Sequence, residues 1–263
     1  MTKTILITGA TDGIGLLTAR KLAAEGHQVL LHGRSEAKLE AAAAEVGGTP
    51  QTYRADLSKM GEVTAMADAI RADHSRLDVL INNAGILKTA QTKTEAGRDI
   101  RFDVNTIAPY VLTRRLLPIL PPEARVVNLS SAAQAPVDVA AMTDFRAMGD
   151  MDAYAQSKLA ITIWSAEMAK SLPDGPAIIA VNPGSLLASK MVKEGFGVAG
   201  SDLNVGADVL IDAALDDRFA QASGRYFDND SGQFAAPHGA ASDPAQVRAV
   251  MQALADLAGP LGA

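Results

Sequence analysis

Tyr154 and Lys158 are the two side chains in this sequence whose types and spacing suggest proton transfer. A separation of four residues places both on one face of a helix, within reach of a common ligand. A phenol with a pKa of about 10 is a weak catalyst at neutral pH, and a neighbouring ammonium lowers that pKa by stabilising the phenolate. The pair predicts acid–base chemistry, although taken alone it also fits a tyrosine that anchors a helix start beside a solvated lysine.

Ser130 and Ser131 follow the apolar run Arg125–Leu129, which predicts a buried strand that delivers two hydroxyl groups to its carboxyl end. A serine there can donate a hydrogen bond to a substrate carbonyl oxygen and hold it against Tyr154. No Gly-x-Ser-x-Gly turn surrounds the pair and no histidine is spaced to activate it, which disfavours acyl transfer. The histidines show no ligand spacing and cysteines are absent, so we predict no metal site.

A turn with three glycines connects the apolar run Thr4–Thr8 to a helical pattern over Gly15–Glu25. Backbone N–H groups and the positive end of the helix dipole meet in such a turn, where a pyrophosphate can bind. Glycines are needed because a Cβ would block the turn or the approach of the phosphate. The candidate cofactor contacts in this turn are Gly9, Thr11, Asp12, Gly13, Ile14 and Gly15.

Arg34 and Ser35 stand at the end of the predicted second strand, Gln28–His32, where a dinucleotide fold meets the adenosine ribose. An acidic residue here selects NAD, whereas an arginine accommodates the 2′-phosphate of NADP. The sequence therefore favours NADP over NAD. Asp12 beside the phosphate turn weakens this preference slightly, and an exposed arginine at a helix start is the alternative reading of Arg34.

Polar and small residues also follow the predicted third and fourth strands. Asp56 and Leu57 follow the third strand, and Asn83, Ala84 and Gly85 follow the fourth. The adenine and the adjacent ribose would lie at these strand ends, and Asn and Gly tolerate the backbone angles of such turns. Each motif by itself fits ordinary turn chemistry equally well.

The composition is that of one enzyme-sized domain. The chain has 263 residues, 48% of them hydrophobic, no cysteine and a net charge of −6. An acidic chain is a poor match for nucleic acid or an anionic membrane as its main partner. The first predicted strand leaves no room for a signal peptide, and no apolar run has the ~18 residues of a membrane span. We expect a cytoplasmic protein with a small-molecule substrate.

Apolar runs alternate with amphipathic segments along the chain, which predicts a single-domain α/β fold over residues 1–263. The runs are apolar throughout, as in parallel strands covered on both faces, so we expect a Rossmann-type doubly wound sheet of about seven strands with helices on both sides. The strands are expected at Thr4–Thr8, Gln28–His32, Thr52–Arg54, Val79–Ile81, Arg125–Leu129, Ile178–Val181 and Arg225–Phe227. The helices are expected at Gly15–Glu25, Glu36–Val46, Gly61–Asp73, Ala96–Leu120, Ala153–Leu172, Val205–Ala213 and Pro244–Ala258.

Taken together, these residues resemble the short-chain dehydrogenase/reductase family. The shared motifs, in chain order, are the glycine turn, Asp56, Asn82-Asn83-Ala84-Gly85, Asn105, Ser131, Tyr154-xxx-Lys158 and Pro183-Gly184. The resemblance implies that Tyr154 donates a proton to a carbonyl in reduction and accepts one in alcohol oxidation. It also implies that Lys158 binds the nicotinamide ribose and lowers the pKa of Tyr154, that Ser131 orients the substrate oxygen, and that Asn105 holds a water in a proton relay.

Two features depart from the simplest members of the family. The insert 132–151 before Tyr154 is longer than theirs and is more similar to the retinol dehydrogenase-like and protochlorophyllide reductase-like branch. After Pro183 and Gly184, Ala188 stands where the family often has a threonine that touches the nicotinamide. We expect Ser189 to take that place through a shifted turn, or the backbone alone to make the contact.

The resemblance implies an oxidoreductase that interconverts a ketone or aldehyde and an alcohol. A lid over residues 186–202 and the insert carry apolar residues that favour a hydrophobic substrate, although ordinary loop packing explains them equally well. An NADP-binding sensor without turnover is the alternative, and a sugar-nucleotide epimerase is disfavoured by the short chain and the glycine spacing. Family members often assemble through the helices near Ala96–Leu120 and Ala153–Leu172, so a homodimer or homotetramer is expected.

Overall fold

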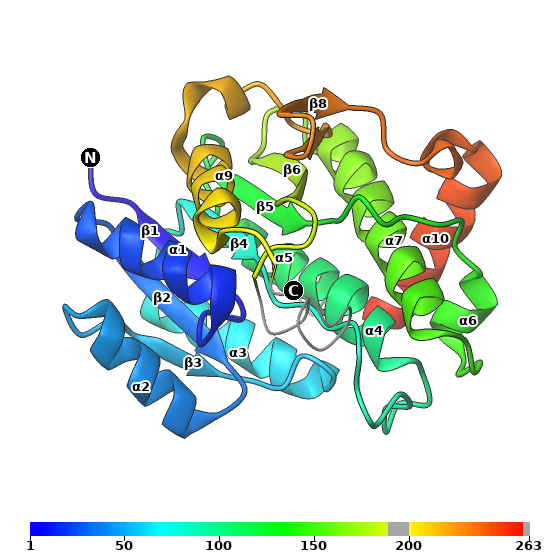
Figure 1. The fold of residues 1–263 in the computed structure, drawn as a ribbon, viewed down its shortest axis with the longest axis horizontal. Helices are drawn as coiled ribbons and strands as arrows, with labels where there is room; N and C mark the ends of the chain where they lie inside the picture. Colours follow the sequence, from blue (N-terminus) through cyan, green and yellow to red (C-terminus); the bar gives the residue numbers. More distant parts are fainter. Residues whose placement is uncertain (189–199, 260–263) are drawn as a thin grey trace.

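The computed structural model describes residues 1–188 and 200–259, whose strands form one sheet (Figure 1). The strands are β1 (Thr4–Ile7), β2 (Gln28–Gly33), β3 (Thr52–Arg54), β4 (Val79–Asn82), β5 (Arg125–Leu129), β6 (Ala177–Asn182), β7 (Tyr226–Asp228) and β8 (Gln233–Ala235). Their order is β3-β2-β1-β4-β5-β6-β7-β8, with β1 to β7 parallel and β8 antiparallel to β7. The predicted doubly wound parallel sheet is confirmed, with one strand more than expected.

Consecutive residues of the central strands are buried on opposite faces of the sheet. Leu6 of β1 belongs with Leu30 and Leu80 to the hydrophobic core of one face, whereas Ile5 and Ile7 belong to the core of the other. Side chains alternate between the faces along a strand, so a sheet covered on both sides needs apolar residues at every position. This requirement explains the unbroken apolar runs in the sequence.

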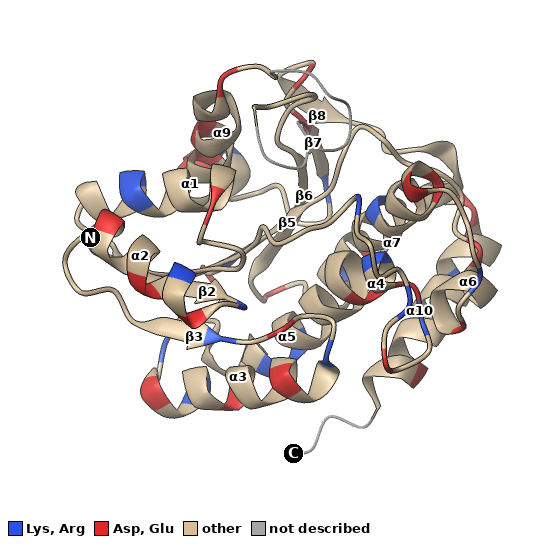
Figure 2. Ribbon diagram, turned by 60° about the horizontal axis from the view of Figure 1, so that its bottom comes forward, with Lys and Arg blue, Asp and Glu red and all other residues tan. Residues whose placement is uncertain are grey.

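Helices cover both faces of the sheet (Figure 2). They are α1 (Gly13–Ala24), α2 (Glu36–Val46), α3 (Met60–Asp73), α4 (Ile100–Phe102), α5 (Ala108–Leu116), α6 (Val139–Thr143), α7 (Asp150–Ser171), α9 (Leu203–Leu215) and α10 (Pro244–Ala258), with the short helices η1 (Asp103–Ile107), η2 (Leu117–Ile119), η3 (Asp217–Phe219) and η4 (Gly239–Ser242). Helices α1, α2 and α9 pack on the face that holds Ile5 and Ile7. Helices α3, α5 and α7 pack on the other face, and α10 contacts α6 and α7.

The single long helix predicted over Ala96–Leu120 is wrong, because the segment consists of several short helical pieces. Asp99 caps α4 by accepting a hydrogen bond from the N–H of Arg101 at 2.9 Å. The next turn, η1, is a π-helix. Pro109 has no N–H to offer the carbonyl of Asn105, so a regular α-helix cannot continue through this point.

Two further elements, β8 and α6, were missed by the sequence patterns because both are short. β8 is held by its central residue Phe234, whose ring contacts Phe219 and Phe227 edge-on at centroid distances of 5.2 and 5.1 Å. α6 lies inside the insert 132–151, and Asp138 caps it by accepting from the N–H of Ala140 at 3.1 Å. A few residues of strand or helix give too little periodicity to detect.

The insert 132–151 is fixed at both of its ends. Gln246 of α10 exchanges two hydrogen bonds of 2.9 Å with the backbone of Val137. The N–H of Phe145 donates to the carbonyl of Gly97 at 2.8 Å, in the loop before α4. The insert is therefore attached both to the C-terminal helix α10 and to the loop that leads into α4 and the π-helix η1.

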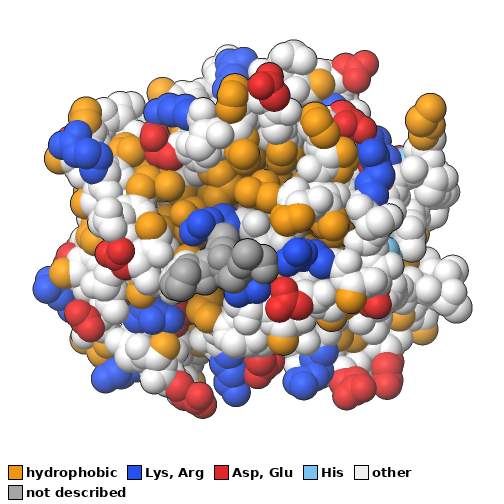
Figure 3. Space-filling view, turned by 180° about the vertical axis from the view of Figure 1, so that it is seen from behind, with side chains coloured by type: hydrophobic (Ala, Val, Ile, Leu, Met, Phe, Trp, Pro, Cys, Tyr) orange, Lys and Arg blue, Asp and Glu red, His pale blue; other side chains and the backbone are white. Residues whose placement is uncertain are grey.

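The surface carries charges of both signs (Figure 2 and Figure 3). On the face seen in Figure 3, hydrophobic side chains gather near the centre, and Lys, Arg, Asp and Glu are interspersed around them. Within residues 1–188 and 200–259, no helix has the length and hydropathy needed to cross a membrane.

A buried ion network joins the loop before α4 to the start of α7. The guanidinium of Arg101 donates to both carboxylate oxygens of Asp99, at 2.8 and 2.6 Å, and to Asp150 of α7 at 2.6 Å. Arg101 and Asp99 have 1% of their side-chain surface exposed. Removing one partner of a buried ion pair leaves an uncompensated charge, so the network fixes where α7 begins.

We expect Arg101→Ala to lower the free energy of unfolding by about 3–5 kcal/mol, because Asp99 would then be buried without its counter-ion. Urea unfolding followed by circular dichroism measures the change. The control is Arg20→Ala, since Arg20 pairs with Glu45 at the surface, where both side chains are about half exposed, and its loss is expected to change the stability far less. Equal losses for the two variants would contradict this account of the network.

Candidate active site

A cleft of about 950 Å³ lies where the carboxyl ends of the parallel strands meet. Side chains and turns that follow β1, β2, β3, β4, β5 and β6 line it together with the start of α7. The predicted site residues that line the cleft are Gly9, Thr11, Asp12, Gly13, Ile14, Gly15, Arg34, Ser35, Asp56, Leu57, Asn83, Ala84, Gly85, Ser131, Tyr154, Lys158, Pro183 and Gly184. Asn105 lies behind the cleft wall, and Ser189 falls outside the described residues.

The turn after β1 has the tight geometry that its glycines allow. Gly9 and Gly13 have φ values of +67° and +54°, a region that other residues rarely adopt. A Cβ on Gly15 would lie 2.4 Å from both the carbonyl oxygen of Gly9 and the side-chain nitrogen of Asn83. Asp12 caps α1 by accepting from the N–H of Gly13 at 2.7 Å. The turn leaves the N-terminus of α1 facing the cleft.

Asn83 and Thr8 join the turns after β4 and β1. The amide of Asn83 donates to the carbonyls of Thr8 and Gly9 at 2.8 and 3.1 Å. The hydroxyl of Thr8 in turn accepts from the N–H of Ala84 at 3.1 Å. Asn83 thus supports the shape of the glycine turn.

His32 is a cleft residue that sequence reasoning missed. Its Nδ1 accepts from the N–H of Gly9 at 3.2 Å, and its Nε2 lies 3.0 Å from the carbonyl of Ala55, to which it donates in the neutral tautomer. Burial lowers the pKa of His32 to about 4, so the ring is neutral at physiological pH. The imidazole therefore connects the glycine turn to the end of β3.

Two cations stand at the edge of the cleft where α2 begins. Arg34 and Lys38 both line the cleft and are exposed, with Ser35 between them as the N-cap residue of α2. Gly33 lets the chain pass close to the turn, because a Cβ there would lie 2.6 Å from the side chain of Thr11. A pair of cations suits a phosphate dianion better than one arginine alone.

Asp56 lines the cleft but also closes its own turn. One carboxylate oxygen accepts from the N–H and the hydroxyl of Ser58, at 3.0 and 2.8 Å. The N–H of Asp56 is held by Glu62 of α3 at 2.9 Å. The second carboxylate oxygen is the one in a position to meet a ligand.

Asn105 connects the loop after β4 to α7. Its amide oxygen accepts from the N–H of Ile86 at 2.8 Å, and its amide nitrogen donates to the carbonyl of Ile86 at 2.9 Å and to the hydroxyl of Ser157 at 3.0 Å. Both amide hydrogens are thus used by protein partners, which gives the side chain a positioning role. A Cβ on Gly85 would lie 3.5 Å from the amide oxygen of Asn105 and 3.4 Å from the ammonium of Lys158.

Tyr154, Lys158 and Ser131 meet at the inner end of the cleft. Tyr154 and Lys158 share one face of α7, and the ammonium lies 5.6 Å from the centre of the phenol ring. Lys158 donates to the carbonyl of Leu129, the last residue of β5, at 2.7 Å. The hydroxyl of Ser131 accepts from the N–H of Ala133 at 3.1 Å.

Burial dominates the proton affinities of this group. It raises the pKa of the Tyr154 phenol, against which a hydrogen bond with Ser131 acts in the lowering direction. It lowers the pKa of the Lys158 ammonium to about 7. The sequence predicts that Lys158 lowers the pKa of Tyr154. In the protein without ligand, desolvation is the larger effect and raises that pKa instead.

The base of the predicted lid 186–202 is held by the β7–β8 hairpin and by its own two ends. Asp230 in the hairpin turn accepts from the N–H and the hydroxyl of Ser185, at 2.7 and 2.5 Å. The N–H of Ala188 donates to the carbonyl of Ser201, and that of Ser201 to the carbonyl of Leu186, both at 2.7 Å. The two ends of the predicted lid are thus held together by backbone hydrogen bonds.

Several cleft residues escaped the sequence analysis. They are His32, Lys38, Ile86, Leu87, Lys88, Ile100, Val104, Leu129 and Ser185, whereas Met151, Leu186 and Leu187 fall in the predicted insert and lid. Lys38 was detectable, because it lies one helical turn after Arg34 at the start of the predicted helix. The apolar members come from separate segments and carry no shared motif. No group of three or more His, Asp or Glu that could hold a metal is present in the described part of the chain.

The family model for short chain dehydrogenases matches residues 3–197. The chain belongs to this family. Human retinol dehydrogenase 13 is 32% identical over 257 residues, covering 86% of this chain and 76% of that protein. The short-chain dehydrogenase chry4 of Gibberella zeae is 28% identical and covers 97% of this chain and 96% of its own length. The relatives support a place in the retinol dehydrogenase-like branch, and the protein is an NAD(P)-dependent oxidoreductase.

Solved structures agree with this assignment. An uncharacterised protein from Mycobacterium paratuberculosis has a TM-score of 0.83 and 30% identity, covering 97% of this chain and 93% of that one. A short chain dehydrogenase from Escherichia coli CFT073, complexed with NADPH, has a TM-score of 0.69 and 27% identity, covering 86% and 96%.

Replacing Lys158 by Met is expected to raise the free energy of unfolding at pH 7 by about 2 kcal/mol, since relief of the ammonium's desolvation outweighs the lost bond to Leu129. The unfolded chain keeps the lysine proton up to a pKa of 10.5, whereas the folded chain releases it near pH 7. The folded wild type therefore gains stability as the pH rises from 7 to 10.5, and the advantage of the variant shrinks. Urea unfolding of the cofactor-free protein at pH 7 and pH 10 measures both effects.

Lys170→Met is the matched control, because Lys170 lies on the same helix with 71% of its side chain exposed and pairs with Glu167. We expect it to change stability by less than about 1 kcal/mol at either pH. If Lys158→Met were less stable than the wild type at pH 7, burial of the ammonium would not lower the stability of the folded protein, and this account would be wrong.

Proposed function

We propose that the protein is an NADP-preferring enzyme that interconverts a ketone or aldehyde and an alcohol, with Tyr154 as acid and base. The observation that carries the proposal is the meeting of Tyr154, Ser131 and Lys158 at one end of a cleft whose other walls include the glycine turn and two cations. A proton donor, a hydrogen-bond donor for an oxygen, and a phosphate-binding turn are the parts that reduction of a carbonyl by a dinucleotide requires.

The cleft residues fit a dinucleotide phosphate. The glycine turn and the N-terminus of α1 line the cleft, where backbone N–H groups can bind a phosphate. Arg34 and Lys38 stand where a 2′-phosphate would lie beside the second strand. NADPH, when bound, supplies the hydride, and the protein supplies position and the proton.

In the reduction direction, the phenol of Tyr154 donates its proton to the substrate oxygen while the hydroxyl of Ser131 donates a hydrogen bond to the same atom. Burial raises the pKa of Tyr154, which keeps the phenol protonated and ready to donate at neutral pH. The ammonium of Lys158 stabilises the phenolate that remains and can bind the nicotinamide ribose hydroxyls. In the oxidation direction the same groups act in reverse, with the phenolate as base.

Asn105 is assigned the supporting role in proton return. Its side chain is engaged by Ile86 and Ser157, so a water behind Lys158 would have to bind another group of Asn105, such as its backbone carbonyl. Such a water would return a proton to the Lys158 amine after its ammonium has passed one toward the Tyr154 phenolate.

The substrate that suits this cleft is hydrophobic. Ile100, Val104, Met151 and Leu186 add apolar surface near the catalytic end of the cleft, and the Met151 and Leu186 side chains are exposed there at 40% and 47%. The sequence has further apolar residues in the predicted lid, Met191, Val192, Phe196 and Val198, which lie outside the described residues. A cytoplasmic location stays a prediction, as does a homodimer or homotetramer. One of the two helices expected to join subunits, α7, is contacted by α10 of the same chain.

Tyr154→Phe is expected to lower carbonyl-dependent NADPH oxidation by about 10³-fold or more, because the ring remains and only the transferable proton is lost. A panel of aldehydes and ketones assayed by absorbance at 340 nm measures it, with NADPH binding followed by fluorescence. Binding should be nearly unchanged in the variant. Wild-type protein that binds NADPH tightly but turns over no carbonyl in the panel would favour the sensor alternative.

The double variant Arg34→Ala, Lys38→Ala is expected to lower kcat/KM for NADPH by about 100-fold and to leave NADH within about threefold, because only NADPH carries the 2′-phosphate. Steady-state kinetics with both cofactors tests this. Arg20→Ala is the control, since Arg20 pairs with Glu45 on the surface and does not line the cleft. A wild-type preference for NADH would refute the assignment of Arg34.

A further inference from the structure

Ser131 lies just beyond the sheet, where no strand pairing holds it. The last ladder bond on this segment runs from the N–H of Ser130 to the carbonyl of Val181 at 2.8 Å. The direction of the next peptide must come from other contacts, because the chain leaves β5 at Leu129 and enters the insert. The hydroxyl on which the proposed reaction depends sits on this residue, and it accepts a hydrogen bond from the N–H of Ala133 at 3.1 Å.

The carbonyl of Ser131 is held by two side chains. The hydroxyl of Tyr226 donates to it at 3.1 Å and the amide of Gln134 at 2.9 Å. The other end of the Gln134 side chain accepts from the N–H of His238 at 2.9 Å, so the C-terminal segment fixes Gln134 as well. A carbonyl with two donors on its oxygen has little freedom to rotate.

Ser130 has partners on α7, besides a longer bond of 3.3 Å from the amide of Gln134. Its hydroxyl bonds to the hydroxyl of Thr162 at 2.6 Å and to the carbonyl of Lys158 at 3.2 Å, both on α7. These bonds commit Ser130 to the helix and leave Ser131 as the serine available to act with Tyr154, since both line the cleft.

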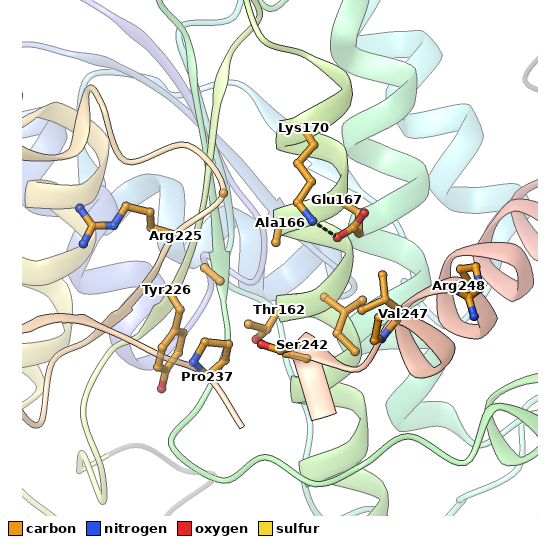
Figure 4. Close-up of a pocket in the computed structure, with 15 residues that line it drawn as sticks. Thr162, Ala166, Glu167, Lys170, Arg225, Tyr226, Pro237, Ser242, Val247 and Arg248 are labelled. Carbon is orange, nitrogen blue, oxygen red and sulfur yellow. Dashed lines mark hydrogen bonds and ion pairs between the residues drawn. The ribbon is translucent and has the colours of Figure 1, made fainter. Parts of the chain in front are cut away.

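Tyr226 lines a second cavity, of about 600 Å³. Figure 4 shows its ring beside Pro237 in that cavity, with Thr162 on the α7 wall. The ring is 7% exposed and sits on β7, which pairs with β6 and β8. Two paired strands make Tyr226 a rigid support for a residue in a loop.

We propose that Tyr226 is a positioning residue for Ser131, which it orients toward the substrate oxygen through the backbone carbonyl. This inference rests on the proposed function, since it assigns Tyr226 a part in the same reaction. Tyr226 does not touch the substrate. Its contribution is to restrict the Ser131 peptide to the orientation in which the hydroxyl serves Tyr154.

A double-mutant cycle of Tyr226→Phe and Ser131→Ala tests the proposal. Tyr226→Phe keeps the ring and removes only the donor, and we expect it to lower kcat about 5–20-fold with little change in NADPH binding. In the Ser131→Ala background the same substitution should change kcat by less than about twofold, because the residue that it orients no longer has a hydroxyl. Equal effects of Tyr226→Phe in both backgrounds overturn the proposal.

Tyr53→Phe is the matched control. Tyr53 is a buried strand tyrosine, 6% exposed, whose hydroxyl donates to Asp73 at 3.0 Å and which does not line the cleft. It should lower the melting temperature by an amount similar to that for Tyr226→Phe and leave kcat unchanged. A similar fall in kcat for both variants would mean that loss of rigidity alone explains the effect.

Crystal structures of the wild type and the Tyr226→Phe variant provide a test that does not need turnover. The Ser131 hydroxyl oxygen is expected to move by about 0.5 Å or more relative to Tyr154, or to occupy two positions. An unmoved, singly ordered Ser131 would overturn the proposal. If Ser131→Ala alone leaves kcat unchanged, the catalytic role of Ser131 fails, whereas the structural comparison still decides whether Tyr226 positions it.

Discussion

Helix α7 packs across the end of β5 through a buried polar stripe. Lys158, Thr162 and Ser165 are spaced by one helical turn each and bond to Leu129, Ser130 and Asn128 at distances of 2.6–2.8 Å. The neighbouring Ser157 of α7 bonds to Asn105 and Thr106 of the π-turn. A slip of one residue would rotate the helix by about 100° and leave all of these buried groups unpaired, at about 1–3 kcal/mol each. The stripe thus fixes the register of α7, and with it the place of Tyr154 one turn earlier.

Local sequence patterns were sufficient to predict the sheet and the glycine turn that lines one part of the cleft. The apolar runs predict seven of the eight strands, because residues buried on both faces leave a continuous signature that needs no knowledge of the partner strand. The glycine turn was equally legible, since the positive φ of Gly9 and the close contact at Gly15 are constraints on single residues. The predicted helices Glu36–Val46 and Pro244–Ala258 have the observed bounds.

Features that depend on contacts between distant segments could not be predicted. The sequence indicates His32 only as the last residue of a predicted strand. In the structure its ring lies between the N–H of Gly9 and the carbonyl of Ala55. The π-helix η1 interrupts the segment predicted as one long helix, and within it the amide of Asn105 bonds to the backbone of Ile86. The proton affinity of Lys158 depends on how completely the fold removes it from water, which motif spacing does not reveal.

The segment after the lid, residues 200–259, supports the catalytic groups from behind. It holds Ser185 through Asp230 and the insert through the pair of bonds between Gln246 and Val137. The aromatic contacts of Phe234 stabilise the hairpin that carries Asp230. The buried ammonium of Lys158 lowers the stability of the fold when no ligand is bound. Contacts outside the reacting groups must therefore stabilise the chain around it. The C-terminal contacts are of this kind, because they hold both sides of the cleft while leaving the strand ends open to ligand.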